Sequence, residues 1–523
     1  MAECEKNALL RSAAGDKTGF NGTLLAWETG MGKTVVTIRL ILSTADNGPT
    51  LILCPNVEIA RQWRSEITKF APQLTVRFYH SEDSSSEDYK IESDDLACYD
   101  VVLSTYNQLL SQYAYMEKAR KDGLAFTDKE YPFYVIRWYR VVSEEAHKMS
   151  NPCGKTAAAC WALPKRLGLL LTATPLQNYP CDLYALLRFL GRDYAMLAKT
   201  KKFPEMYDRR YRAKGVAPAA GFQDVKEILG DCMIHRRKAA VSIHLPKRHD
   251  HKPRLVALAP PERRLYDYTD REHHHKGPLP KCTRVRQVCV GPKMLLVPLS
   301  KDDEELANDT SAADVVKAME EISQVGTTAG PHTQSAPRTD KLVISKLPES
   351  IRHLAHLFDA TYVPSAQREV LAVLQEIKIR SRGTEKTIVY STFRSPLETL
   401  SAQLDILNIG NEIYYGNMSS DERTTALQRL DADARCTVLL MTIQSGGTGL
   451  NITSCNNVVF LEPWWNPYLE EQAVGRVYRI GQTKPVNVYR VLVADTIQTE
   501  KMVPIQNKKR ENIDKLLGQL EVS

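Results

Sequence analysis

Two stretches of the chain alternate short runs of Leu, Ile and Val with amphipathic helical patterns. Continuous apolar runs such as Leu51-Ile52-Leu53 are typical of strands covered on both faces, as in parallel sheets packed between helices. The strands expected in the first stretch are 23–28, 50–55, 75–80, 100–105, 140–144 and 168–172. Those expected in the second are 386–391, 412–415, 437–441, 457–461 and 486–492. The alternation predicts an α/β fold with two lobes, each built on a parallel sheet.

The length of 523 residues indicates several domains, because one hydrophobic core rarely serves more than about 300 residues. We expect a first lobe over residues 1–245 and a second lobe over residues 366–523. Sequence rich in Gly, Pro and Ser between 281 and 337 is typical of loops or disorder. Residues 246–365 are therefore expected to form a helical and partly disordered interlobe region.

Composition restricts the function only weakly. The net charge of +7 permits a polyanionic partner without requiring one. No run of about 18 apolar residues occurs, so we expect no membrane-spanning helix and no membrane partner. The 11 cysteines contain no C-x-x-C pair, which favours reduced thiols over a zinc module.

The segment Gly30-Met31-Gly32-Lys33-Thr34 lies between an expected strand and an expected helix. Glycines let backbone N–H groups close round phosphates, and the N-terminus of the helix then faces the anion. We expect this segment to bind ATP, with Lys33 at the β- and γ-phosphates and the Thr34 hydroxyl on Mg²⁺. The strict phosphate-loop pattern lacks its first glycine, because Trp27 stands there. A chance glycine turn is the alternative.

Two acids, Glu144 and Glu145, end the expected strand 140–144. In a phosphate-loop ATPase an acid at the carboxyl end of a neighbouring strand holds Mg²⁺, and a following Glu orients the attacking water. We therefore assign Glu144 to Mg²⁺ together with Thr34, and Glu145 to the water. A solvated turn is the alternative for paired acids.

The second stretch carries two arginines, Arg476 and Arg479, three residues apart. On a helix both would point the same way. Ordinary surface charge is the alternative for such a pair. A glycine-rich turn, 446–449, follows the expected strand 437–441 and permits close approach of the backbone.

Several motifs resemble those of a known family. Glu144-Glu145-Ala146-His147 resembles the D-E-A-H box of superfamily-two helicases, with Glu in place of the first Asp. Residues 171–178 resemble the third motif of the SWI/SNF-type DNA-dependent ATPases, and Trp464-Trp465-Asn466-Pro467 with Arg479-Ile480-Gly481-Gln482 resembles the sixth motif and the element before it. Shorter segments with similar matches are 62–66, 100–106, 234–238, 284–289 and 416–419.

This resemblance implies two RecA-like lobes, with Arg476 and Arg479 reaching the γ-phosphate from the second lobe. It implies a translocase on double-stranded DNA that uses ATP and Mg²⁺ to remodel chromatin or protein–DNA complexes in the nucleus, in transcription regulation or DNA repair. Nucleosomes or other DNA-bound proteins would be its partners. The ATP-binding residues it implies are Gly30, Met31, Gly32, Lys33, Thr34, Gly449 and Gln472. Those for DNA binding or coupling are Gln62, Trp63, Ser104, Thr105, Thr172, Thr174, Asn178, Thr442 and Trp464.

The sequence departs from the family pattern in two ways. The family's adenine-reading Gln segment is not found before Gly30, so the first lobe is expected to be shortened at its N-terminus. Glu144 adds one methylene relative to Asp, which displaces the carboxylate by about 1.5 Å. A catalytically weakened DNA- or chromatin-binding scaffold is therefore one alternative. A strand-separating helicase is another.

Overall fold

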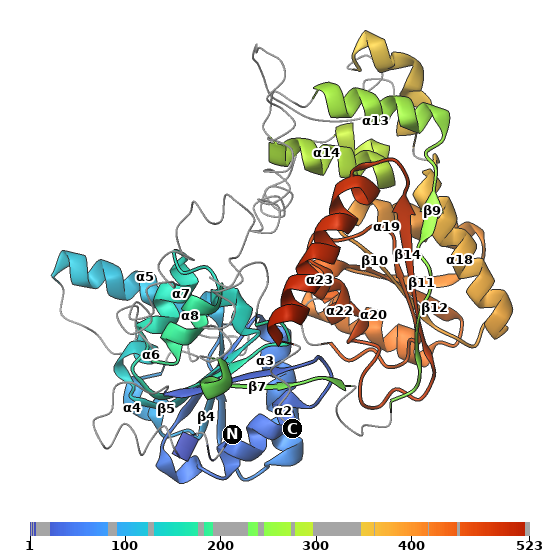
Figure 1. The fold of residues 1–523 in the computed structure, drawn as a ribbon. Helices are drawn as coiled ribbons and strands as arrows, with labels where there is room; N and C mark the ends of the chain where they lie inside the picture. Colours follow the sequence, from blue (N-terminus) through green and yellow to red (C-terminus); the bar gives the residue numbers. More distant parts are fainter. Residues whose placement is uncertain are drawn as a thin grey trace. The chain divides into compact units, whose positions relative to one another are not determined.

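The computed structural model describes residues 1, 3, 5–6, 21–81, 91–123, 130–175, 182–191, 229–238, 245–272, 278–296, 347–359, 361–416, 418–446 and 450–517. The chain divides into two compact units, one comprising Met1–Ile243 with Asn512–Ser523, and the other His244–Glu511. Each unit is an α/β structure built on a seven-stranded parallel sheet (Figure 1). The predicted fold class is confirmed.

The first sheet has the strand order β3-β4-β2-β5-β6-β1-β7. Its strands are β1 (Gly22–Trp27), β2 (Thr50–Cys54), β3 (Val76–Phe78), β4 (Val101–Thr105), β5 (Trp138–Glu144), β6 (Lys165–Leu171) and β7 (Met233–Arg236). The helices are α2 (Lys33–Leu42), α3 (Val57–Phe70), α4 (Ser93–Ala97), α5 (Tyr106–Asp122), α6 (Pro132–Val135), α7 (Lys155–Trp161) and α8 (Asp182–Phe189), with short 3-10 turns η1 (Ala45–Asn47) and η3 (Ala146–Met149).

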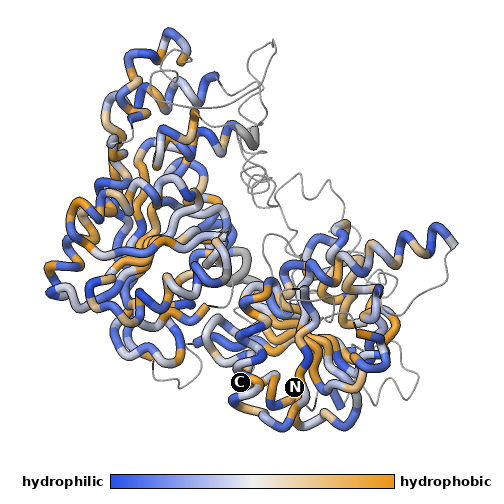
Figure 2. Tube along the Cα trace, turned by 180° about the vertical axis from the view of Figure 1, so that it is seen from behind, coloured by the Kyte–Doolittle hydropathy of each residue, from blue (hydrophilic) through white to orange (hydrophobic). Residues whose placement is uncertain are grey.

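Successive strand residues of this sheet enter two different cores, because side chains alternate between the faces of a strand. Leu51 and Leu53 pack with residues of α5, α7 and α8, whereas Ile52 and Cys54 pack with residues of α2 and α3. Both faces of β2 are therefore covered, which explains its unbroken apolar sequence. Figure 2 shows hydrophobic residues gathered along the central strands of each unit.

The second sheet has the order β11-β12-β10-β13-β14-β8, and β9 also pairs with β14. Its strands are β8 (Arg248–Asp250), β9 (Arg254–Val256), β10 (Thr387–Ser391), β11 (Gly410–Tyr414), β12 (Cys436–Thr442), β13 (Asn457–Phe460) and β14 (Val486–Val493). The helices are α13 (Pro260–Glu272), α14 (Pro278–Val290), α18 (Ser365–Ser381), α19 (Arg394–Ile406), α20 (Ser420–Ala432), α21 (Ile443–Gly446), α22 (Pro467–Val474) and α23 (Val503–Leu517), with shorter turns η6 (Pro292–Leu296), η7 (Glu349–Phe358) and η8 (Gln498–Met502).

Helices α13 and α14 pack into a core shared with α18, α19 and one face of the second sheet. The buried carboxylate of Glu262 on α13 accepts hydrogen bonds from the Tyr362 hydroxyl and from the Ser365 N–H and hydroxyl groups. Residues of η6 and η7 pack against the same core. The structure thus groups the described part of 246–365 with the second unit instead of separating it as a domain of its own.

All eleven strands expected from the sequence occur within about three residues of their predicted bounds. The strands β7, β8 and β9 were not expected, since they are short and carry Arg, His or Asp instead of an apolar run. In the stretch 281–337, expected to be mainly loop or disorder with a possible helix at 312–323, the described residues 281–296 belong instead to α14 and η6, and the rest lies outside the described residues. Among the helices in the described ranges, none is long and apolar enough to cross a membrane.

Candidate functional site

The loop between β1 and α2 has the shape that phosphate binding requires. Gly30 and Gly32 adopt φ angles of 77° and 82°, in the left-handed region that favours glycine. The Lys33 ammonium donates hydrogen bonds to the carbonyl oxygens of Trp27 at 2.9 Å and Glu28 at 3.3 Å. Lys33 therefore lies inside the turn of its own loop, at the N-terminus of α2. Thr34 follows it in the first turn of that helix, and Met31 is buried.

Strand β7 flanks this loop. It pairs with β1, with Arg236 opposite Trp27 and its guanidinium 5.3 Å from the indole centroid. The Glu28 N–H donates to the Arg236 carbonyl oxygen at 3.2 Å, and the Lys238 N–H donates to the Glu28 carboxylate at 3.0 Å. The segment 234–238 thus braces the start of the phosphate loop, a role that the sequence motif did not indicate.

The acids Glu144 and Glu145 lie at the same edge of the sheet as the phosphate loop. Strands β5, β6 and β1 are parallel neighbours, and Glu144 is in register with Leu171. Carboxyl ends of parallel strands share one edge of the sheet. The sequence prediction that these acids and Lys33 belong to one site of the first unit therefore fits the topology of this sheet.

His147 connects the acids to the loop after β6. Its Nδ1 atom lies 3.4 Å from the Glu145 carboxylate and 3.4 Å from the Thr172 hydroxyl oxygen. The Thr172 hydroxyl oxygen in turn accepts a hydrogen bond from the Thr174 N–H at 3.0 Å. Glu145 itself has a left-handed backbone with φ of 50°, which turns the chain sharply after β5. Sequence reasoning quoted His147 within a motif but gave it no role.

Tyr106 and Cys54 lie near Glu144. The Tyr106 hydroxyl donates a hydrogen bond to the Glu144 carbonyl oxygen at 3.0 Å. Burial raises the pKa of the Cys54 thiol well above its usual value, and the nearby Glu144 carboxylate raises it further. Cys54 therefore stays protonated beside the acid and does not compete with it for a cation.

Seven of the residues expected to couple to DNA are buried, namely Trp63, Ser104, Thr105, Thr172, Thr174, Thr442 and Trp464. Trp63 is 2% exposed and packs between α3 and the sheet. The Ser104 hydroxyl donates to the Tyr79 carbonyl oxygen, and the Thr105 hydroxyl oxygen caps α5. Gln62 is half-buried. Asn178 lies outside the described residues.

The expectation that Arg476 and Arg479 share a helical face is wrong. Helix α22 ends at Val474, and the C-cap Gly475 donates to carbonyl oxygens of the last turn. Both arginines follow in an irregular turn. The Arg476 carbonyl oxygen accepts a hydrogen bond from the Ile452 N–H at 3.1 Å, and the Arg479 guanidinium donates to the Leu450 carbonyl oxygen at 3.3 Å.

Gln482 holds this arginine turn in place. Its amide nitrogen donates to the carbonyl oxygens of Thr453, Cys455 and Val477 at 2.8–3.3 Å. Its amide oxygen accepts from the next two backbone N–H groups of the chain, at 3.0 and 2.9 Å. The last residue of the Arg479-Ile480-Gly481-Gln482 motif thus acts as a structural clamp. Gln472 is buried on α22, and Gly449 lies outside the described residues.

Two known families match parts of the chain. Residues 1–309 match the family described as the SNF2-related domain, and residues 369–481 match the helicase conserved C-terminal domain. The chain belongs to the SNF2-related family. The predicted resemblance to SWI/SNF-type, helicase-like ATPases of superfamily two is confirmed.

Relatives of this SNF2-family chain cover nearly its full length. It is 26% identical to the uncharacterized ATP-dependent helicase C23E6.02 of Schizosaccharomyces pombe, over 99% of this chain and 60% of the relative. It is 26% identical to the DNA repair protein RAD5A of Arabidopsis thaliana, over 92% of this chain and 52% of the relative. It is 27% identical to a probable global transactivator of Orgyia pseudotsugata multicapsid polyhedrosis virus, over 95% and 87%. The chain thus spans little more than half the length of the first two relatives.

Among solved structures, the Sulfolobus solfataricus SWI2/SNF2 ATPase core in complex with dsDNA is 20% identical, covering 100% of this chain and 97% of that one. The TM-score is 0.37.

Trp464 and Trp465, which belong to the motif that resembles the SNF2 family, lie in the interior of the second unit. The Arg286 guanidinium is 5.3–5.4 Å from the ring centroids of Phe393, Trp464 and Trp465. Trp464 is 1% exposed, and its part in DNA coupling stays a prediction. Thr442, at the end of β12, shares a hydrogen bond with the Ser445 hydroxyl. Arg286 links α14 to the loops after β10 and β13 through this aromatic cluster.

Proposed function

We propose that this SNF2-family chain is an ATP-dependent translocase on double-stranded DNA that remodels chromatin or other protein–DNA complexes. The observation that carries the proposal is the shared sheet edge of the first unit. There the phosphate loop, the acids Glu144 and Glu145, and the loop of Thr172 and Thr174 follow the parallel strands β1, β5 and β6. This set of groups suits binding and hydrolysis of a nucleoside triphosphate.

The residues at this edge fit ATP and Mg²⁺. Gly30 and Gly32 give the loop a conformation that aims backbone N–H groups at phosphate oxygens, and Lys33 supplies a cation. Mg²⁺ prefers hard oxygen ligands, which the Thr34 hydroxyl and the Glu144 carboxylate would supply. Bound Mg²⁺ would neutralise negative charge on the β- and γ-phosphates.

The chain's own groups would then act on the γ-phosphate. Glu145, paired with His147, orients the attacking water. Arg476 and Arg479 of the second unit neutralise charge that develops on the transferred group, an effect that can be worth several powers of ten in rate. Because these arginines belong to the other unit, hydrolysis is tied to domain movement.

Double-stranded DNA is the proposed partner, contacted mainly through its phosphates and with little regard to base sequence. Nucleosomes or other DNA-bound proteins are the proposed targets, and the nucleus is the proposed location. The relatives support a role in repair or transcription, since one is named a DNA repair protein and another a probable global transactivator.

ATP turnover of the purified chain, measured with and without double-stranded DNA, tests the proposal. We expect turnover to rise on adding DNA and to vanish in Lys33→Ala. Nucleotide-competent protein whose turnover does not respond to DNA would overturn it. A strand-displacement assay with the same protein separates a translocase from a strand-separating helicase, for which we expect no displacement.

A catalytically weakened scaffold is the second candidate, and Glu144 is the observation that favours it. This Glu ends β5, where the family pattern has Asp. ATP binding together with negligible turnover would support the scaffold over the translocase.

A further inference from the structure

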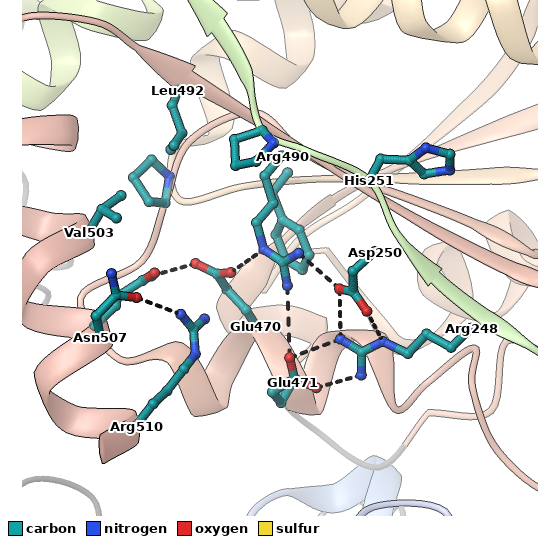
Figure 3. A pocket seen from close by; sticks show the side chains of 14 residues that line it. Arg248, Asp250, His251, Glu470, Glu471, Arg490, Leu492, Val503, Asn507 and Arg510 are labelled. Atoms are coloured by element: carbon teal, nitrogen blue, oxygen red, sulfur yellow. Dashed lines mark hydrogen bonds and ion pairs between the residues drawn. The ribbon is translucent and has the colours of Figure 1, made fainter. Parts of the chain in front are cut away.

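A network of five charged residues surrounds a pocket of about 510 Å³ in the second unit. Figure 3 shows Arg248 and Asp250 from β8, Glu470 and Glu471 from α22, and Arg490 from β14 turned toward one another. No sequence motif indicated these residues, and the proposed hydrolytic chemistry does not use them.

Helix α22 is held by two adjacent glutamates, of which Glu471 binds Arg248 and also lies 3.8 Å from Arg490, the partner of Glu470. Glu471 receives two hydrogen bonds from the Arg248 guanidinium, at 2.7 and 3.0 Å. Glu470 accepts a hydrogen bond from the Arg490 guanidinium at 3.0 Å through one oxygen. Its other oxygen accepts from the backbone N–H of Trp464 at 3.1 Å. Bidentate hydrogen bonds between an arginine and a carboxylate fix the relative orientation of the two groups as well as their distance. The pairs thus set the direction of α22 at its central turn.

The remaining acid joins the two arginines. Asp250 accepts from Arg248 at 2.7 Å and from Arg490 at 3.0 Å. Three of the five side chains are at most one quarter exposed, so water screens their pairing less than that of ordinary surface pairs. The network is therefore one connected structure, running from β8 through β14 to α22.

The network links the first strand of the second unit to the helix that precedes Arg476 and Arg479. Strand β8 begins four residues after His244, where the second unit starts, so Arg248 belongs to the first strand after the chain enters this unit. Helix α22 ends at Val474 and leads directly into the turn that carries Arg476 and Arg479. Arg248 therefore connects the entry strand to the helix that positions both arginines.

We propose that Arg248 and Glu471 are positioning residues for ATP hydrolysis, which hold helix α22 and thereby aim Arg476 and Arg479. This inference rests on the proposed function. Loss of the pair would leave the phosphate loop and the acids Glu144 and Glu145 intact, because those groups belong to the first unit. It would lower the rate of the chemical step, since misplacement of a catalytic group by about 1 Å can cost up to a hundredfold.

The chain offers a matched control in Arg254 on β9. Its guanidinium pairs with Glu376 of α18 at 2.6 Å, so it is also an arginine of a short entry strand bound to a glutamate of a helix. Its ion pairs with Glu369 and Glu376 both lead to α18, which carries none of the proposed catalytic residues. Arg254→Met thus removes a comparable ion pair without touching the arginine turn.

The experiment compares DNA-stimulated turnover of wild type, Arg248→Met, Glu471→Gln, the double variant and Arg254→Met. We expect kcat to fall about tenfold in each variant of the Arg248–Glu471 pair, with the KM for ATP and the DNA affinity unchanged. The loss in the double variant should be smaller than the two single losses combined, because both changes break the Arg248–Glu471 link. Arg254→Met should keep the wild-type kcat.

The thermal stability of every variant is measured alongside its kinetics. If Arg248→Met does not fold, the comparison rests on Glu471→Gln, which keeps the shape of the side chain. Equal kcat for Arg248→Met, Glu471→Gln and Arg254→Met would overturn the positioning role. So would additive losses in the double variant, or a rise in KM that accounts for the loss. Absent DNA stimulation in wild type would instead overturn the proposed function, and the inference with it.

Discussion

The Nδ1 atom of His147 lies 3.4 Å from the Thr172 hydroxyl oxygen, joining the loop after β5 to the loop after β6. The same atom lies 3.4 Å from the Glu145 carboxylate. A movement of the loop that carries Thr172 and Thr174 would therefore displace Glu145, the acid proposed to orient the attacking water.

Substituting His147 should uncouple DNA from hydrolysis. We expect His147→Ala to lower the DNA-stimulated turnover about tenfold, because Glu145 loses the group that orients it. Turnover without DNA should change much less. The control is His353→Ala, an exposed histidine on η7, which should behave as wild type. A His147 variant with normal stimulation would contradict the link.

The length of the acid at position 144 can be tested directly. If the translocase proposal holds, Glu144→Asp should keep turnover within about tenfold of wild type, whereas Glu144→Ala should abolish it. Steady-state ATP hydrolysis with saturating DNA is the measurement. A rise of a hundredfold or more in Glu144→Asp would instead favour the weakened scaffold.

Any side chain introduced at Gly32 should destabilise the protein through backbone strain alone. A Cβ there would meet nothing within 4 Å, but φ is 82°, so Gly32→Ala should cost about 1 kcal/mol of unfolding free energy. Gly123 has the same open surroundings and a φ of 64°. Gly123→Ala should cost a similar amount yet leave ATP affinity unchanged, whereas Gly32→Ala should weaken it. Denaturant unfolding and nucleotide titration distinguish the two.

Acid should destabilise the second unit through Asp250 and Glu471. Burial tends to raise the pKa of each carboxyl, but hydrogen bonds and positive charge from Arg248 outweigh it, so both pKa values lie below their usual range. The stabilisation is therefore fully present above the unfolded-state values of about 3.9 and 4.3, and it is lost as pH falls through the lower folded-state values.

Unfolding free energies between about pH 7 and pH 3 measure this loss. Arg248→Met should flatten the acid limb of the curve, because the carboxyls then lose the charge that depresses their pKa values. Arg254→Met, which leaves Asp250 and Glu471 untouched, should keep the wild-type shape. An unchanged acid limb in Arg248→Met would contradict this account.

Local patterns predicted the sheets and the phosphate loop because their signals are local. Apolar runs gave the buried strands, and the glycines with Lys33 gave the loop. The strands β7, β8 and β9 were missed because they are short and polar. The helix end at Val474 was missed as well, since the residues up to Arg479 carry no Pro and the only glycine, Gly475, also occurs inside helices.

Contacts between distant residues were beyond the reach of the sequence. Arg248 and Glu471 are 223 residues apart, and no periodicity links them. Burial was equally hidden: nothing local distinguishes a tryptophan such as Trp63, which fills a core, from one that contacts a ligand. Family motifs name such residues without saying which of them face outward.

The turns η6 and η7 pack against one core although about 50 residues of chain separate them. The two turns therefore fix neighbouring points of the second unit's core. Closing a longer loop between fixed ends costs only about 0.6 kcal/mol for each doubling of its length. We therefore expect that a reporter domain inserted between η6 and η7 leaves both sheets undisturbed.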